Sequence, residues 1–182
     1  MSRRWKGNIN RAILDAAAAF NSLGKVAEEY LTNSLDAFET ILHDNRYEQI
    51  QRSDCKIQFI LDHIKNRIIF RDEHPFMGMS SKFIFDHFFN IHAPNISRTR
   101  YINVRGKHGT GKSAAFGIEA EYLLVDSVYK GKRTTIKSTI ESLQTEGEEA
   151  AELDEIRVDE LTSLPNGTSI EIKLSDLSKI KL

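Results

Sequence analysis

The first forty residues of the chain carry apolar positions at helical spacing. The alanine-rich run AILDAAAAF follows Ile9, a break falls near residues 21–24, and apolar positions three and four apart then continue to Leu42. This spacing predicts two helices before residue 44, because residues three and four apart share one face of a helix. Further along, SSKFIFDHFF predicts a short helix opened by serine caps, and KSAAFGIEA predicts the start of another.

Short runs rich in apolar and β-branched residues predict the strands. CKIQFILD and NRIIFRD are separated by a polar break and predict a hairpin, and EYLLVDSVYKGKRTTIKSTI predicts two strands joined by a turn. GTSIEIKL predicts the last strand, whereas the acidic stretch TEGEEAAELDE fits either a loop or a strand edge. This order of elements predicts an α/β (α+β) two-layer sandwich, with a mixed, mainly antiparallel sheet covered by helices on one face.

One long segment shows no periodicity. Residues 90–112 carry Pro94 and three glycines, so we expect a long loop, and loops of that length in a compact domain are usually functional or disordered. The whole chain of 182 residues is long enough for one sizeable core, which predicts a single domain over residues 1–182. Residues 1–12 are expected to form an amino-terminal arm.

Composition narrows the range of partners. The 25 basic and 26 acidic side chains nearly balance, so nothing indicates a nucleic-acid partner. No stretch approaches the ~20 apolar residues that a membrane span needs. A lone cysteine, Cys55, and an amino terminus without the apolar core of a signal peptide favour a cytoplasmic protein.

The first candidate constellation lies on the second predicted helix. Glu29, Asn33 and Asp36 stand at positions i, i+4 and i+7, which share one face of a helix. The apolar positions fall on roughly the opposite side, so the three could also be the solvated stripe of an amphipathic helix. Asparagine is the informative member, because its side-chain oxygen is a neutral ligand for a hard cation.

The second constellation is the glycine-rich run RGKHGTGKSAAFGI. Its glycines would let the backbone approach a phosphate, and the amides at a helix start attract anions. The run could instead be a flexible surface loop. Gly106, Gly111, Lys112 and Ser113 also satisfy G-x-x-x-x-G-K-S, the phosphate loop of P-loop NTPases. A P-loop domain would need a parallel sheet after this motif, whereas the turns that follow it suggest antiparallel strands.

Together the two constellations resemble the GHKL superfamily, the ATP-binding domains of gyrase, the large heat-shock chaperones, histidine kinases and MutL. That family combines a helix with E-x-x-x-N-x-x-D, a D-x-G-x-G turn, a G-x-x-G-x-G loop and a late G-T. The resemblance extends over about residues 16–174. The matching residues are Glu29, Asn33 and Asp36 for the helix, Gly106, Gly109 and Gly111 for the loop, and Gly167 and Thr168 for the late pair.

The second motif departs from the family pattern. Asp72 follows an apparent strand as the family's aspartate does, but His74 stands where a glycine is expected. Gly78 and Met79 come later than the family's second glycine, so the turn must be reshaped.

The resemblance implies that the chain binds ATP and Mg²⁺ and hydrolyses ATP, slowly as an isolated domain. Glu29 would activate the attacking water, Asn33 would be the metal ligand, and Asp72 would accept a hydrogen bond from the adenine amino group. Residues 90–112 would contain the ATP lid and the glycine loop. The other implied nucleotide contacts are Gly78, Met79, Gly106, Gly109, Thr110, Gly111, Lys112, Ser113 and Thr168.

The same resemblance implies partners. Lid closure or a nucleotide-dependent homodimer would drive a larger assembly, and a downstream domain or partner subunit would supply a phosphate-contacting lysine. Two alternatives remain open from the sequence: a P-loop NTPase that uses the loop from Gly106 to Ser113, and a module that senses ATP without hydrolysing it.

Overall fold

The computed structural model describes residues 9–43, 49–90, 111–144 and 152–180. Its helices and helical turns are α1 (Ile9–Ala17), α2 (Leu23–Leu42), η2 (Arg52–Asp54), α3 (Ser81–Phe83), η3 (Ile84–Phe88), η4 (Gly111–Ile118), α5 (Ile140–Gln144) and η5 (Leu177–Lys179). Its strands are β1 (Lys56–Asp62), β2 (Arg67–Glu73), β3 (Ala120–Tyr129), β4 (Lys132–Thr139), β5 (Asp154–Leu161) and β6 (Gly167–Leu174).

The two amino-terminal helices confirm the prediction from helical spacing. The Ser22 side chain caps α2 by accepting a hydrogen bond from the Lys25 amide, which satisfies one of the free donors at a helix start. Ser80 caps α3 in the same way, and α3 runs directly into the wider π turn η3. None of the helices in the described ranges is long and apolar enough to cross a membrane.

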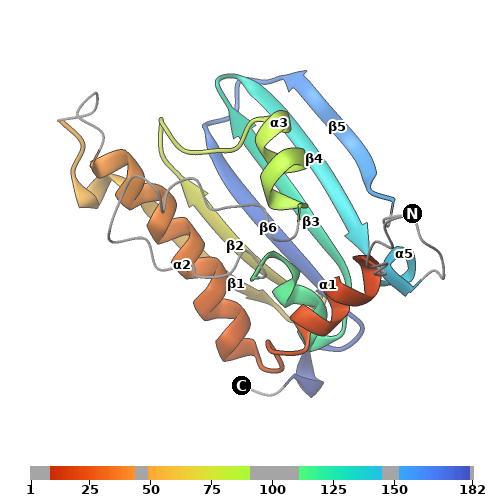
Figure 1. Ribbon diagram of the computed structural model, residues 1–182. Helices are drawn as coiled ribbons and strands as arrows, with labels where there is room; N and C mark the ends of the chain where they lie inside the picture. The colour runs from red at the N-terminus through yellow and green to blue at the C-terminus, as the bar shows by residue number, and fades with distance from the viewer. Residues whose placement is uncertain (1–8, 44–48, 91–110, 145–151, 181–182) are drawn as a thin grey trace, which may run out of the picture.

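Among the described residues the sheet has six strands in the order β1-β2-β6-β3-β4-β5, and each neighbouring pair is antiparallel. This confirms the mainly antiparallel sheet and contradicts the parallel sheet that the P-loop alternative requires. In Figure 1 the helices α1, α2 and α3 lie on one side of this sheet, which gives the predicted two layers.

Two further elements differ from the expectations. KSAAFGIEA was expected to open an α-helix, but η4 is a 3-10 helix that packs against α1, α2 and β3. The edge strand β5 begins at Asp154, inside the acidic stretch, and continues beyond it to Leu161, with mostly exposed side chains.

Side chains form rows across the helix-covered face, because directly paired residues on neighbouring strands point to the same side. Two of these rows are apolar and buried, and they form the centre of the core. One row is Phe70, Ile170, Val125 and Ile136, and the other includes Ile68, Ile172 and Leu123.

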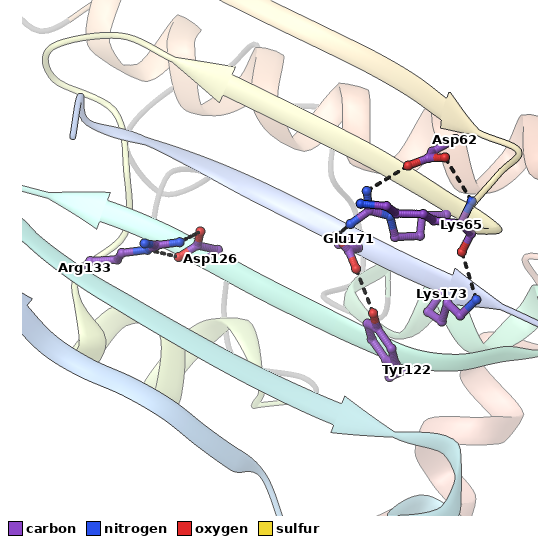
Figure 2. Close-up of polar contacts among 8 residues, drawn as sticks. Asp62, Lys65, Tyr122, Asp126, Arg133, Glu171 and Lys173 are labelled. Carbon is purple, nitrogen blue, oxygen red and sulfur yellow. Dashed lines mark hydrogen bonds and ion pairs between the residues drawn. The ribbon is translucent and has the colours of Figure 1, made fainter.

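The opposite face of the sheet carries charged side chains that pair with each other (Figure 2). Arg67 contacts Asp62 at 2.8 Å and Glu171 at 2.7 Å, and the Tyr122 hydroxyl donates to Glu171 at 2.7 Å. These ion pairs link neighbouring strands across this face, although the buried Arg67 Nε has no hydrogen-bond partner among the described residues.

Candidate functional site

A polar row continues the two apolar rows at one end of the sheet. The register aligns Asp72 of β2 with Thr168 of β6, Thr168 with Ser127 of β3, and Ser127 with Thr134 of β4. Asp72 is 7% exposed and Ser127 is fully buried, so polar side chains here replace core residues. Buried polar groups need hydrogen-bond partners, and the following contacts supply them.

Both carboxylate oxygens of Asp72 accept hydrogen bonds. The Ser34 hydroxyl on α2 donates to Oδ2 at 2.8 Å, and the Thr168 amide donates to Oδ1 at 2.9 Å. Burial raises the pKa of Asp72 to about 6, although both hydrogen bonds favour the charged form. The structure therefore brings Asp72 and Thr168 together, as the resemblance implies, and adds Ser34.

The turn after Asp72 contains His74 where the family pattern has a glycine. His74 is buried, and its ring packs 5.3 Å from Phe38 and 5.6 Å from Phe76. The Asn166 side chain donates to the Pro75 carbonyl at 2.6 Å, which fixes the turn against the segment before β6. An imidazole thus fills the space at this position and helps to anchor the turn.

The turn ends at Gly78, where the backbone needs a glycine. Gly78 has a φ of +99°, and a Cβ there would lie 2.0 Å from the Val128 carbonyl oxygen. The next amide, that of Met79, donates to the Ser127 hydroxyl at 2.7 Å. Gly78 and Met79 therefore lie beside the polar row despite the altered spacing.

The residues expected at the phosphates form a second group. The side-chain amide of Asn33 donates to Glu29 Oε1 at 3.3 Å, and the Glu29 side chain lies directly against Gly111. A Cβ on Gly111 would stand 1.7 Å from Glu29 Oε1, so only a glycine accommodates this contact. Asp36 is only 7% exposed, which contradicts the alternative of a solvated stripe.

The environment of Glu29 suits a proton acceptor. Burial raises the pKa of its carboxyl, and the nearby charge of Asp36 raises it further, whereas the hydrogen bond from Asn33 lowers it. A raised carboxyl pKa brings a general base closer to the pH at which it works.

Lys112 is held by backbone oxygens. Its ammonium donates to the carbonyls of His87 and Asn90, and burial lowers its pKa. The Tyr30 hydroxyl donates to the Lys112 carbonyl at 3.0 Å, which ties the start of η4 to α2. The adjacent Ser113 is buried. In this arrangement the lysine ammonium fastens the end of η3 to η4.

The donor set fits a magnesium ion that is shared with phosphates. Asn33 uses its amide nitrogen toward Glu29, which leaves its amide oxygen as a ligand of the kind that Mg²⁺ prefers. The described residues contain no group of three or more His, Cys, Asp or Glu that could hold a metal alone. Any Mg²⁺ here would therefore take its other ligands from a nucleotide and water.

Some predicted residues lie outside the described residues. These are Gly106, Gly109 and Thr110, together with residues 91–110 of the predicted lid and residues 1–8 of the predicted arm. The last residues assigned to the arm, from Ile9, belong to α1.

Three hydroxyl residues of the site were not predicted from the sequence: Tyr30, Ser34 and Ser127. One signal for Ser127 was present in the sequence, since Leu123 and Val125 alternate inward on β3 and a serine takes the next inward position. Ser34 lay next to Asn33, but its contact with Asp72 depends on how α2 packs on the sheet.

We expect Asp72 to titrate near pH 6, about two units above an ordinary aspartate whose pKa is 3.8. Folding raises this pKa, so the contribution of the protonated carboxyl to stability is complete below about pH 4 and is lost as the pH rises through about 6. Carbon-13 NMR of aspartate carboxyls should show this late titration, and Asp72→Asn should remove that signal alone. A titration near pH 4 would contradict the buried environment described above.

A family of known proteins matches most of the chain. The family model described as "Histidine kinase-, DNA gyrase B-, and HSP90-like ATPase" matches residues 21–169, well over half of the chain. No curated protein matches the chain at a significant level. The matched segment contains Glu29, Asn33 and Asp72 as well as the pair Gly167 and Thr168. The chain therefore belongs to the family of histidine kinase-, DNA gyrase B- and HSP90-like ATPases.

Proposed function

We propose that this protein binds Mg-ATP between α2 and the polar end of the sheet and hydrolyses it to ADP and phosphate. One observation carries the proposal: α2 contributes residues both to the group around Asp72 and to the group around Gly111. Its Ser34 holds Asp72 at the end of the sheet, and its Glu29 meets Gly111 at the start of η4. A single rigid helix would thus set the base contact and the phosphate contacts relative to each other.

Each group has a role in this proposal. Asp72 accepts a hydrogen bond from the adenine amino group, and Thr168 supports it. Gly111 lets the backbone approach the phosphates, and Asn33 contributes an oxygen to Mg²⁺. Mg²⁺, when bound, would neutralise charge on the phosphates. Glu29 takes the proton of the attacking water, and its raised pKa supports this role.

The larger cycle is part of the same proposal. Residues 90–112 contain the ATP lid and the glycine loop, and lid closure or pairing of two copies couples ATP turnover to a larger assembly in the cytoplasm. We assign the whole chain to one domain. A lysine from a partner subunit or following domain would complete the phosphate contacts, and we expect hydrolysis without such a lysine to be slow.

Calorimetric titration with ATP and GTP at equal Mg²⁺ tests the base contact. ATP should bind roughly tenfold to a hundredfold more tightly, because Asp72 would face the carbonyl oxygen of guanine, and an unpaired buried acceptor costs about 1–3 kcal/mol. Asp72→Asn should reduce this preference, since its amide offers a donor.

Asp15→Asn is the matched control, because the Asp15 side chain is 74% exposed on α1. Equal affinities of the wild-type protein for ATP and GTP would remove Asp72 from the role. ATP binding without turnover, even in single-turnover experiments, would favour the module that senses ATP without hydrolysing it.

A further inference from the structure

The Ser127 hydroxyl has three neighbours at hydrogen-bond distance. It accepts from the Met79 amide at 2.7 Å, donates to the Gly167 carbonyl at 3.1 Å, and lies 3.1 Å from the Thr168 hydroxyl. It is also fully buried, with an exposed fraction of 0%. No water needs to share in these contacts, so the protons can be assigned from the chemistry of the four groups.

A serine hydroxyl has one hydrogen and two lone pairs. The Met79 amide can only donate and therefore occupies one lone pair, while the Gly167 carbonyl can only accept and therefore takes the one hydrogen. The contact with Thr168 must then use the second lone pair of Ser127 and the hydrogen of the threonine hydroxyl. Thr168 is left with lone pairs only.

The neighbouring carboxylate of Asp72 can likewise only accept hydrogen bonds from a ligand. Each oxygen of Asp72 already accepts one hydrogen bond, from Ser34 or from the Thr168 amide, and keeps one lone-pair site. The side-chain oxygens of Asp72 and Thr168 therefore both face a ligand as acceptors.

We propose that Ser127 is a specificity-determining residue. Because Ser127 accepts the hydrogen of the Thr168 hydroxyl, this end of the site can only accept hydrogen bonds from a ligand. It therefore requires a base whose exocyclic amino group donates both of its hydrogens. The inference rests on the proposed function and deepens it. Adenine carries such an amino group, with one hydrogen for Asp72 and one for Thr168. Hypoxanthine has a carbonyl oxygen at the same position and would face two acceptors.

The test compares ATP with inosine triphosphate, whose base has a carbonyl oxygen in place of the amino group and carries a hydrogen on N1. Wild-type protein should prefer ATP, and Ser127→Ala should reduce that preference by about tenfold, because the freed Thr168 hydroxyl can then turn its hydrogen toward the carbonyl. ATP binding should weaken in this variant, while inosine triphosphate binding should hold or improve. N6,N6-dimethyl-ATP, which has no amino hydrogens, should bind the wild-type protein weakly.

Controls separate specificity from folding. Ser138→Ala removes a buried hydroxyl from the same face of the sheet on β4 and should leave the preference unchanged. In a Thr168→Val background, Ser127→Ala should have no further effect on the preference. Should Ser127→Ala fail to fold, Thr168→Val alone should still reduce the preference for ATP over inosine triphosphate, since it removes the Thr168 hydroxyl as an acceptor.

Two outcomes would overturn the inference. In one, Ser127→Ala weakens both nucleotides equally, which would make the residue merely structural. In the other, Thr168→Val leaves the preference intact. A wild-type protein that binds neither nucleotide would instead refute the proposed function, so the two failures can be told apart.

Discussion

Replacing Glu29 with glutamine is expected to lower the rate of ATP hydrolysis by roughly 10²–10⁴, the usual contribution of a positioned general base. ATP binding should stay within a few-fold of wild type, because glutamine keeps the shape of the side chain and its contact with Asn33 and Gly111. Single-turnover measurement with protein in excess of ATP is the suitable assay, since steady turnover by the isolated chain is expected to be slow.

Glu28→Gln is the matched control for this experiment. Glu28 is the preceding residue on α2 and is exposed, so its loss should leave hydrolysis nearly unchanged. Wild-type turnover by Glu29→Gln, in a preparation that is demonstrably active, would show that the proposed mechanism is wrong.

Gly111→Ala is expected to reduce the rate of ATP hydrolysis by about 10²-fold or more, although this variant keeps the Glu29 side chain. The new Cβ would overlap the Glu29 carboxylate and its Cγ, at 1.7 Å and 2.4 Å, so the side chain must move away. Displacing a general base by even a small distance removes most of its contribution. Gly111 does not adopt a positive φ, so alanine should not strain the backbone itself.

A double-mutant cycle makes this prediction specific. In the Glu29→Gln background, Gly111→Ala should cost little more, because both changes remove the same group from its position. Gly24→Ala is the control: the nearest atom to its new Cβ is Ser22 Oγ, at 3.9 Å. Fully additive losses would mean that Gly111 acts on something other than Glu29.

Periodicity predicted most of the fold. The pairs α1 and α2, β1 and β2, and β3 and β4 all stand where the spacing of apolar residues placed them. The strand β5 was not predicted as a full strand. Ile156 and Val158 alternate with charged residues, but the run is short and follows an acidic stretch that fits either a loop or a strand edge. Its pairing with β4 is also interrupted twice, as is common at protected sheet edges.

The site was predicted less completely, and for a physical reason. Glu29 and Asn33 are four residues apart on one helix, so their contact follows from local spacing. The contacts of Ser127 depend on the register of three strands, and those of Ser34 on how a helix packs against a sheet. Single hydroxyls that act through such long-range geometry leave no motif in the sequence.

The hydrogen bond between Asp72 and Thr168 also bears on how the chain folds. It joins residues that are 96 positions apart, so the pairing of β2 with β6 closes a long loop whose entropy must be lost before the strands gain from contact. The proposed base contact would therefore form only when the centre of the sheet is complete, and neither hairpin provides it alone. A nucleotide bound at the proposed site would bind the finished fold and not its precursors, so it would slow unfolding without hastening folding.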